Sequence, residues 1–290
     1  MSDEISQPSS EVPSRKQFIR RHSLIVRVTH WINVMCVSVL LMTGLQIFNA
    51  HPRLYWGEYG TFGDHALLEI GSEQQGNTLK GFLRIGSLRI ITTNVLGVSQ
   101  EENSATARAF PAWATMPSYQ DLGAGRQWHF FFAWLFVING FVYILHGICR
   151  SHFRKNVFPD KDQLRPKNLW HEINDHARLK FAKGEEARRY NALQKITYLL
   201  VIFILLPLMI ISGLTMSPAL DATFPFLTDL FGGRPSARMM HFITATLLVS
   251  FIIVHVLMVL FSGFWNNIRS MITGSYAIET QTKKSKGESS

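Results

Sequence analysis

Four long apolar stretches constrain the fold of this 290-residue chain more than any other feature. A helix needs about 20 apolar residues to cross the hydrocarbon core of a bilayer. The stretches that reach this length without any Lys, Arg, Asp or Glu are Val28–Pro52, Gln127–Cys149, Ile196–Leu220 and Met239–Ile268. We therefore predict an all-α integral membrane protein, built as a bundle of four transmembrane helices.

The predicted membrane domain covers residues 24–272, with spans at about 24–48, 127–149, 193–216 and 238–265. Basic residues precede the first span, as in a signal peptide, but its apolar stretch is too long and no small-residue cleavage site follows it. The flank 1–23 is expected to be a disordered, basic terminus. The flank 273–290 is expected to be a polar tail that does not fold.

The 29 basic residues are distributed unevenly along the chain. Residues 1–27, 150–195 and 265–290 hold 21 of them, whereas residues 49–126 and 217–238 hold eight. Cytoplasmic segments of membrane proteins are enriched in Lys and Arg, so we expect both termini and the loop 150–192 in the cytoplasm and the long loop 49–126 in the periplasm. The net charge of +9 is then a topology signal, and we predict no nucleic-acid partner.

The segments outside the spans carry few further signals. In TLKGFLRIGSLRIITTNVLGV of the long loop, two β-prone runs flank Gly86-Ser87, and a two-residue loop that begins with Gly predicts a hairpin. The segment Arg150–Lys195 is expected to contain one or two short amphipathic helices. The two cysteines, Cys36 and Cys149, are too few for a disulfide framework or an iron–sulfur site and are expected to be packing residues.

Five of the eleven histidines lie in the spans or at their ends, namely His30, His129, His146, His241 and His255. Ionisable side chains inside a membrane are costly and mark functional sites. His241 and His255 are fourteen residues apart, nearly four helical turns, so they share a face but differ in height by about 21 Å. One metal ion cannot bridge that distance, whereas two separate sites can each use one of these imidazoles.

Depth in the membrane assigns a partner to each of these two histidines. The first span enters from the cytoplasm, which puts His30 level with His255 near the inner surface. The second span enters from outside, which puts His129 level with His241 near the outer surface. Two imidazoles on facing helices hold a haem iron in this way. We therefore predict two non-covalent b haems, and ligation removes the cost of burying bare imidazoles.

Other residues are candidates for secondary roles around the haems. Glycines lie at positions where a porphyrin ring between the helices would need room, namely Gly44, Gly140 and Gly213. The alternative is that they only allow ordinary close packing of the helices. Three arginines flank the histidines and are candidates for binding haem propionates, namely Arg27, Arg126 and Arg238. The alternative is that they anchor the spans at the membrane interface.

His146 has several possible roles. It follows His129 by seventeen residues, about 100° around the helix, near the cytoplasmic side. It is a candidate for an alternative ligand of the inner haem iron or for a residue that transfers protons. The remaining alternative is a hydrogen-bonded histidine at a helix end.

Several motifs resemble those of a known superfamily. RVTHWINVMCVSVLLMTG (Arg27–Gly44), with Arg, His-Trp and a downstream Thr-Gly, resembles the first span of the cytochrome b561 and nickel–iron hydrogenase cytochrome b superfamily. The fourth span is similar through its H-x13-H pattern at His241 and His255. Five further segments resemble the subgroup of thiosulfate reductase-type cytochrome b subunits: NAHPRLYWGEYG, FPAWATMPSYQDLG, RQWHFFFAWLFVING, YNALQK and GGRPSARMMHF. The resemblance covers all four spans.

The resemblance implies the same ligand pairs as the depth argument, His30 with His255 and His129 with His241. YNALQK resembles the quinone-site segment of formate dehydrogenase cytochrome b, which implies that Asn191 and Gln194 bind a quinone. The alternative for Asn191 is capping of a helix N-terminus.

The subgroup also implies a partner and a location. Its members accompany an exported molybdopterin oxidoreductase, which implies a periplasmic redox partner docked on the long loop and a location in the bacterial inner membrane.

The predicted function is electron transfer, within a respiratory chain, between a molybdopterin-dependent periplasmic oxidoreductase and the quinone pool. A stand-alone superoxide:quinone oxidoreductase of the b561 type is an alternative, although such proteins have short outer loops. A hydrogenase cytochrome b subunit is a second alternative, which the length of the loop disfavours. A haem-free transporter or membrane anchor that uses the histidines to move protons is a third.

Overall fold

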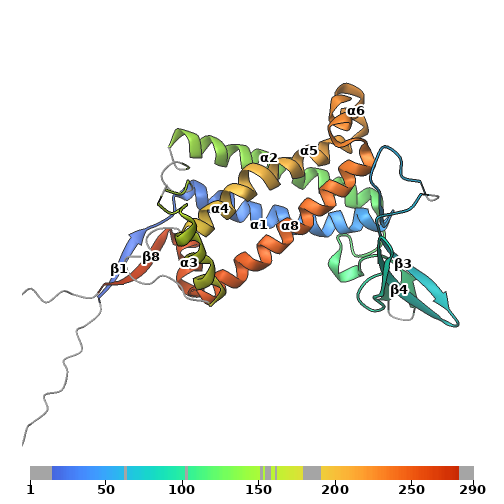
Figure 1. The fold of residues 1–290 in the computed structure, drawn as a ribbon, viewed down its shortest axis with the longest axis horizontal. Helices are drawn as coiled ribbons and strands as arrows, with labels where there is room; N and C mark the ends of the chain where they lie inside the picture. The colour runs from blue at the N-terminus through green and yellow to red at the C-terminus, as the bar shows by residue number, and fades with distance from the viewer. Residues whose placement is uncertain are drawn as a thin grey trace, which may run out of the picture. The chain divides into compact units, whose positions relative to one another are not determined.

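The structure is a computed structural model that describes residues 15–61, 64–101, 104–150, 153, 158–160, 162–178 and 191–280. The described residues fall into two compact units (Figure 1). The larger unit lies within Val28–His152 and Thr197–Val254. The smaller unit lies within Met1–Arg27, Phe153–Ile196 and His255–Ser290.

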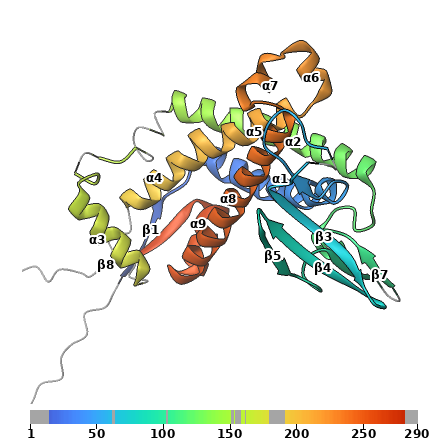
Figure 2. The same cartoon turned by 45° about the vertical axis from the view of Figure 1, so that its right-hand side comes forward.

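Four helical segments of the described chain are long and apolar enough to cross a membrane, which confirms the four predicted spans. They are α1 (Leu24–Asn49), α2 (Leu122–Cys149), the segment Ala192–Thr215 and α8 (Arg234–Phe261). Figures 1 and 2 show the greater part of these helices running alongside one another in the larger unit. The main part of all four spans therefore belongs to a single compact body.

The segment Ala192–Thr215 is not a regular helix throughout. It consists of α4 (Ala192–Leu200), the π-helical turn η4 (Val201–Leu205) and α5 (Leu206–Thr215). Pro207 is the second residue after the wider turn. A proline in a regular α-helix lacks the N–H for one hydrogen bond, and its ring clashes with the carbonyl four residues earlier. The π-helical turn widens the backbone at this place and accommodates the proline.

Polar and apolar contacts join the first two spans. The Asn139 side chain on α2 donates hydrogen bonds to the Thr29 carbonyl at 2.8 Å and to the Asn33 Oδ1 at 2.7 Å, both on α1. Cys36 is fully buried with Phe132 and Phe136, as expected for a packing residue. Close packing and hydrogen bonds of this kind hold membrane bundles together, because apolar side chains are as well solvated by lipid as by a neighbouring helix and so supply no hydrophobic driving force.

Two span ends differ from the prediction because single residues set where the helix begins or ends. The second helix begins at Leu122 instead of Gln127, because the Asp121 side chain caps it by accepting a hydrogen bond from the Ala124 N–H at 2.9 Å. The last span ends at Phe261 instead of residue 265, because Gly263 adopts a left-handed conformation with φ of 112°.

The long loop between α1 and α2 forms more sheet than the predicted hairpin. Strands β2 (Arg53–Leu54), β3 (Leu68–Gln75), β4 (Thr78–Ile85) and β5 (Leu88–Ile91) make an antiparallel sheet in that order. The hairpin at Gly86-Ser87 is confirmed: Ile85 pairs with Leu88, and Gly86 has φ of 57°. Strands β6 (Val98–Glu101) and β7 (Ser104–Ala107) form a separate pair, and a short helix η1 follows at Ala112–Ala114.

An apolar cluster fastens this sheet to the helices. Leu54 and Ile70 of the sheet are buried with Phe48 of α1, and Met239 and Phe242 of α8 pack against them. The sheet therefore lies at the end of the bundle where α1 finishes and α8 begins.

The connection between the third and fourth spans also contacts the long loop. It contains two short helices, α6 (Pro218–Thr223) and α7 (Phe226–Phe231). At the start of α8, the Ser236 hydroxyl accepts a hydrogen bond from the Gly57 N–H at 2.7 Å. This contact fixes the beginning of α8 to the long loop.

The smaller unit contains a strand pair that contradicts the expected unfolded flanks. β1 (Arg15–Arg20) pairs antiparallel with β8 (Ser275–Thr280), so parts of both flanks 1–23 and 273–290 are folded. The pair forms because Ile278 is buried and the Arg21 N–H bonds to the Gly274 carbonyl at 2.8 Å. Residues 1–14 and 281–290 lie outside the described residues. In the segment 150–195, α3 (Pro166–Ala177) confirms one of the expected short helices.

A further helix, α9 (Phe264–Thr273), follows the last span and was not predicted. Its polar side faces β8: Asn266 exchanges two hydrogen bonds with the backbone of Ala277, at 2.8 and 2.9 Å. Its apolar side chains point outward, with Trp265 81% and Ile272 59% exposed. This arrangement is the reverse of that in a soluble protein and is typical of a helix that lies in a membrane interface.

Candidate functional site

The structure brings two of the predicted ligands together in the larger unit. His129 on α2 and His241 on α8 have ring centroids 6.4 Å apart, with ring planes at 63° to each other. Two imidazoles that bind one metal ion from opposite sides, through bonds of about 2 Å each, have centroids about 6 Å apart. The separation of the two rings therefore fits one ion between them, as the outer haem requires.

On the first side of this pair, the ring of His129 lies against α1. Its Nδ1 is 3.0 Å from the Thr43 hydroxyl oxygen. That hydroxyl donates its proton to the Val39 carbonyl at 2.7 Å. A Cβ on Gly44 would lie 3.5 Å from the ring Cε1, so the glycine leaves just enough room for the imidazole edge.

On the second side, the ring of His241 lies against α5 in the same manner. Its Nδ1 is 3.1 Å from the Ser212 hydroxyl oxygen and 3.1 Å from the Met209 carbonyl oxygen. The Ser212 hydroxyl donates to the Leu208 carbonyl at 2.7 Å. A Cβ on Gly213 would lie 3.3 Å from the ring Cε1, which is closer than an ordinary contact.

These contacts decide which ring atoms remain for a metal ion. Nδ1 of each imidazole is occupied by a hydroxyl on the neighbouring helix, so Nε2 is the nitrogen left with a lone pair. Neutral imidazole nitrogen is a common haem ligand. The donor set and its spacing thus fit a bis-histidine haem.

Two of the small residues have a different role from the one expected. Gly44 and Gly213 lie against the rings of His129 and His241, where they make room for the imidazoles themselves. A Cβ on Gly140 would have no atom within 4 Å.

Sequence reasoning missed Thr43 and Ser212. A signal for them was present, because each precedes one of these glycines as a hydroxyl–glycine pair inside an apolar span.

The inner pair stays a prediction. His30 lies on α1 in the larger unit, half-buried, with its ring edge-on to Trp31 at 5.5 Å between centroids. His255 lies on α8 in the part assigned to the smaller unit and is also half-buried. His146 stands in the last turn of α2, where its carbonyl accepts the Arg150 N–H at 3.0 Å.

Each of the three candidate arginines has a partner within the protein. Arg126 is exposed, and its guanidinium lies 5.7 Å from the ring centre of Phe130. Arg238 donates to the carbonyl of His51, and Arg27 donates to the carbonyl of Ile272. A role in binding propionates stays a prediction for all three.

The two candidate quinone residues lie at the start of α4. The Asn191 side-chain oxygen accepts the Gln194 N–H at 3.0 Å, which is the helix cap that the alternative interpretation expected. Lys195 beside them is buried, and its ammonium donates to the Gln163 Oε1 at 3.0 Å and to the Phe158 carbonyl at 3.3 Å. The quinone role of Asn191 and Gln194 stays a prediction.

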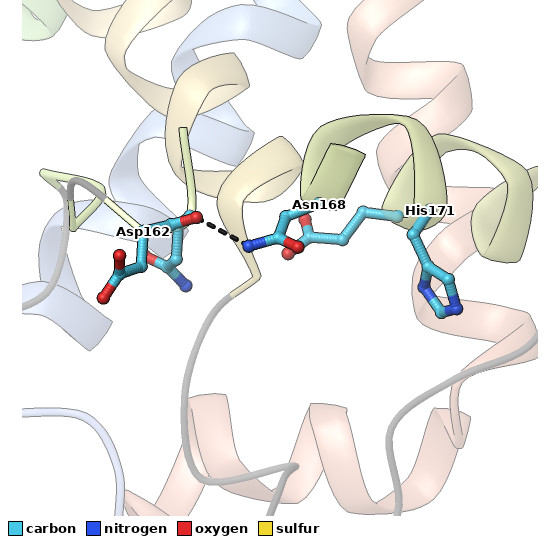
Figure 3. Close-up of a pocket in the computed structure, with 5 residues that line it drawn as sticks. Asp162, Asn168 and His171 are labelled. Atoms are coloured by element: carbon cyan, nitrogen blue, oxygen red, sulfur yellow. Dashed lines mark hydrogen bonds between the residues drawn. The ribbon is translucent and has the colours of Figure 1, made fainter. Parts of the chain in front are cut away.

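A cavity of about 260 Å³ lies near this helix start in the smaller unit. Figure 3 shows Asn168 on α3 donating a hydrogen bond to the backbone carbonyl of Asp162 at 2.7 Å, with His171 one turn further along the helix. The residues that line the cavity are Asp162, Gln163, Asn168, His171 and Glu172. All five of these residues are polar or ionisable, whereas sites for flat organic cofactors are lined mostly by hydrophobic and aromatic side chains. The cavity does not suit a porphyrin or a quinone ring.

Comparison with known proteins identifies the family of the chain. Residues 21–274 match the family model of the prokaryotic cytochrome b561. The chain belongs to this family. It is therefore a multi-pass membrane protein and a cytochrome b561-type electron-transfer subunit, and haem b is the cofactor that the family implies.

One relative of this cytochrome b561 comes from Azospira oryzae. It is named putative protein-methionine-sulfoxide reductase subunit YedZ1 and is 28% identical over 244 residues, which are 84% of this chain and 92% of the relative. No solved structure matches the chain.

Proposed function

We propose that this cytochrome b561 binds two b haems and carries electrons through the membrane between a periplasmic oxidoreductase and the quinone pool. His129 and His241 hold the outer haem, and His30 and His255 hold the inner one. The observation that supports the proposal most strongly is the separation of 6.4 Å between the His129 and His241 rings, which fits one iron. Haem b supplies one-electron redox chemistry when it is bound.

The protein's own residues bind and shield the cofactors. The imidazoles of the outer pair lie 6.4 Å apart with their Nδ1 atoms bonded to hydroxyls, and the sheet β2–β5 is attached to the end of α1 and α8 near this pair. A partner that docks on the sheet comes close to the outer haem. Gln194 and the capping Asn191 stand at the start of α4, where we place the quinone.

The periplasmic partner is proposed to be a molybdopterin-type oxidoreductase. The relative named as a subunit of a protein-methionine-sulfoxide reductase supports a role as one subunit of a reductase. A reductase consumes electrons, so quinol at the inner side is the donor and the outer haem is the exit. The long loop, which folds into a sheet, favours a docked partner over a stand-alone superoxide:quinone oxidoreductase.

The test is a haem count in single-histidine variants of the full chain. His129→Ala and His241→Ala each remove one of two haems, measured by pyridine haemochrome per polypeptide, and leave the other with an unchanged midpoint potential. His65→Ala, an exposed residue of the long loop, is the matched control and retains both haems.

Several results would contradict the proposal. Loss of both haems or of neither in His129→Ala contradicts the pairing. A wild-type reduced-minus-oxidised spectrum without b-type bands favours a haem-free anchor. A protein that is isolated alone from native membranes and reduces quinone with superoxide contradicts the role as a subunit.

A further inference from the structure

The two sides of the outer pair use the same local arrangement on two different helices. Thr43 on α1 and Ser212 on α5 each direct the hydroxyl at the carbonyl four residues earlier, at 2.7 Å in both cases. Each hydroxyl also lies 3.2 Å from the carbonyl three residues earlier. A glycine follows each hydroxyl residue and faces the imidazole edge. The same set of contacts thus occurs twice, once for each histidine.

The direction of the hydrogen bonds follows from the number of protons available. A hydroxyl has one proton and two lone pairs. Thr43 and Ser212 use the proton on a carbonyl of their own helix, so each oxygen has only a lone pair to offer the imidazole. The Nδ1 of His129 and His241 must therefore carry the proton and donate it, at 3.0 and 3.1 Å. The same donation fixes the rotation of each ring.

We propose that Thr43 and Ser212 are positioning residues of the outer haem. They hold His129 and His241 in the tautomer with Nδ1 protonated, so that both Nε2 atoms face the iron before it binds. The donated hydrogen bond also makes the imidazole a stronger electron donor, which favours the oxidised iron and lowers the midpoint potential. This inference rests on the proposed function, because it concerns the same haem.

A merely structural role for the hydroxyls is the competing explanation. Serine and threonine in membrane helices commonly bond to the carbonyl four residues earlier, and small polar residues pack helices closely. The chain offers a control in Ser38 on α1, an exposed residue whose hydroxyl donates a hydrogen bond to the Val34 carbonyl at 2.8 Å. Ser38→Ala removes the same kind of bond away from the two imidazoles.

The experiment compares four variants of the haem-loaded, full-length protein. Thr43→Val keeps the side-chain shape and Ser212→Ala removes little volume, so both delete mainly the hydroxyl. We expect Thr43→Val to weaken outer-haem retention by about 10 to 100-fold, as loss of a hydrogen-bond partner of a metal ligand does. Ser212→Ala has a smaller effect in the same direction, because the Met209 carbonyl still accepts from the Nδ1 of His241 at 3.1 Å. We also expect the outer midpoint potential to rise and the low-spin haem signal in electron paramagnetic resonance to shift. Thr43→Ser and Ser38→Ala retain wild-type values.

The outcomes separate the two proposals. Wild-type potential, spectrum and haem retention in Thr43→Val and Ser212→Ala overturn the positioning role, provided that His129→Ala still removes one haem. A Thr43→Ser variant that behaves like Thr43→Val also overturns it, because the methyl group and not the hydroxyl is then what matters. If His129→Ala keeps both haems, the proposed function itself fails, whatever the hydroxyl variants do.

Discussion

Replacing Gly213 by alanine tests how closely the ring of His241 must pack against α5 for the outer haem to bind. An added Cβ would stand 3.3 Å from the Cε1 and 3.6 Å from the Nδ1 of His241. Carbon atoms attract each other best at about 3.5 to 4.0 Å, so the ring or the helix must retreat by a few tenths of an ångström. Retreat of the ring changes its separation from the ring of His129, which is 6.4 Å between centroids. The substitution therefore disturbs the spacing that one iron between the two rings requires.

The overpacking at Gly213 sets the size of the change. Overpacking of a close contact costs about 1–3 kcal/mol. Alanine in place of glycine also stabilises a helix by up to about 1 kcal/mol, but this gain is the same with and without bound haem. A displacement of a few tenths of an ångström corresponds to the lower end of the overpacking range, roughly 1 kcal/mol, so outer-haem affinity falls about fivefold.

The chain supplies its own graded controls for this experiment. A Cβ on Gly44 would stand 3.5 Å from the ring of His129, an ordinary contact, and one on Gly140 would meet nothing within 4 Å. Haem loss during detergent dilution, followed by absorbance, should therefore rank Gly213→Ala above Gly44→Ala and leave Gly140→Ala at or below the wild-type rate. Equal haem loss in Gly213→Ala and Gly140→Ala would refute the reasoning.

Three further predictions concern the parts of the molecule outside the spans. Burial, and then the charges of Arg238 and Arg53, lower the pKa of His51 below its usual 6.5. The unfolded chain therefore binds a proton at His51 more readily than the folded chain, and the thermal stability of the long loop should fall as the pH drops through about 6.5. This fall in stability should be smaller in His51→Gln. Glu69 is buried between two guanidiniums, one of them Arg53 at 2.7 Å, so Glu69→Gln should destabilise the sheet by about 3 kcal/mol in urea. The protein in liposomes can carry a nitroxide label in place of Trp265 or of Thr273, and collision with a lipid-soluble reagent (oxygen) or an aqueous nickel complex can be measured by electron paramagnetic resonance. The label at Trp265 should be accessible to oxygen and shielded from the nickel complex, and the label at Thr273 should show the reverse.

Each of these predictions has an outcome that contradicts it. A flat stability profile between pH 7.5 and 5.5 in the wild type (about one pH unit either side of the usual histidine value) would show that His51 is not shielded from protonation. Glu73, in an exposed ion pair with Arg89, is the control for Glu69, and equal effects of Glu73→Gln and Glu69→Gln would show that burial is unimportant. A nitroxide at Trp265 that is shielded from both reagents would indicate a protein contact instead of lipid.

The spans could be predicted from the sequence because lipid imposes a single strong requirement, a long stretch without charge. Their ends could not, since Asp121 and Gly263 act through local backbone geometry outside or within the apolar stretch. The pair His129 and His241 could be predicted because helical rise and antiparallel direction fix the height of each residue. Their neighbours Thr43 and Ser212 were not recognised, because the hydroxyl–glycine pair that marks each of them is equally suited to helix packing.

The strands were predicted only in part, for reasons of sequence distance and composition. The hairpin at Gly86 is local and flanked by β-prone residues. The hairpin between β3 and β4 turns at Gly76, which has φ of 60°, but the polar run around it hides the strands. The pairing of β1 with β8 joins two ends of the described chain, and no local pattern reports a contact between residues so far apart.

The outer pair has a consequence for the order of assembly. Thr43, His129, Ser212 and His241 come from the first, second, third and fourth spans in turn. The fourth span is the last of them to leave the ribosome, so this cluster cannot close while the chain is still being inserted. Under the proposed function, porphyrin binding at the outer position must therefore follow complete insertion of the polypeptide, and the bound porphyrin then joins the earliest and the latest spans.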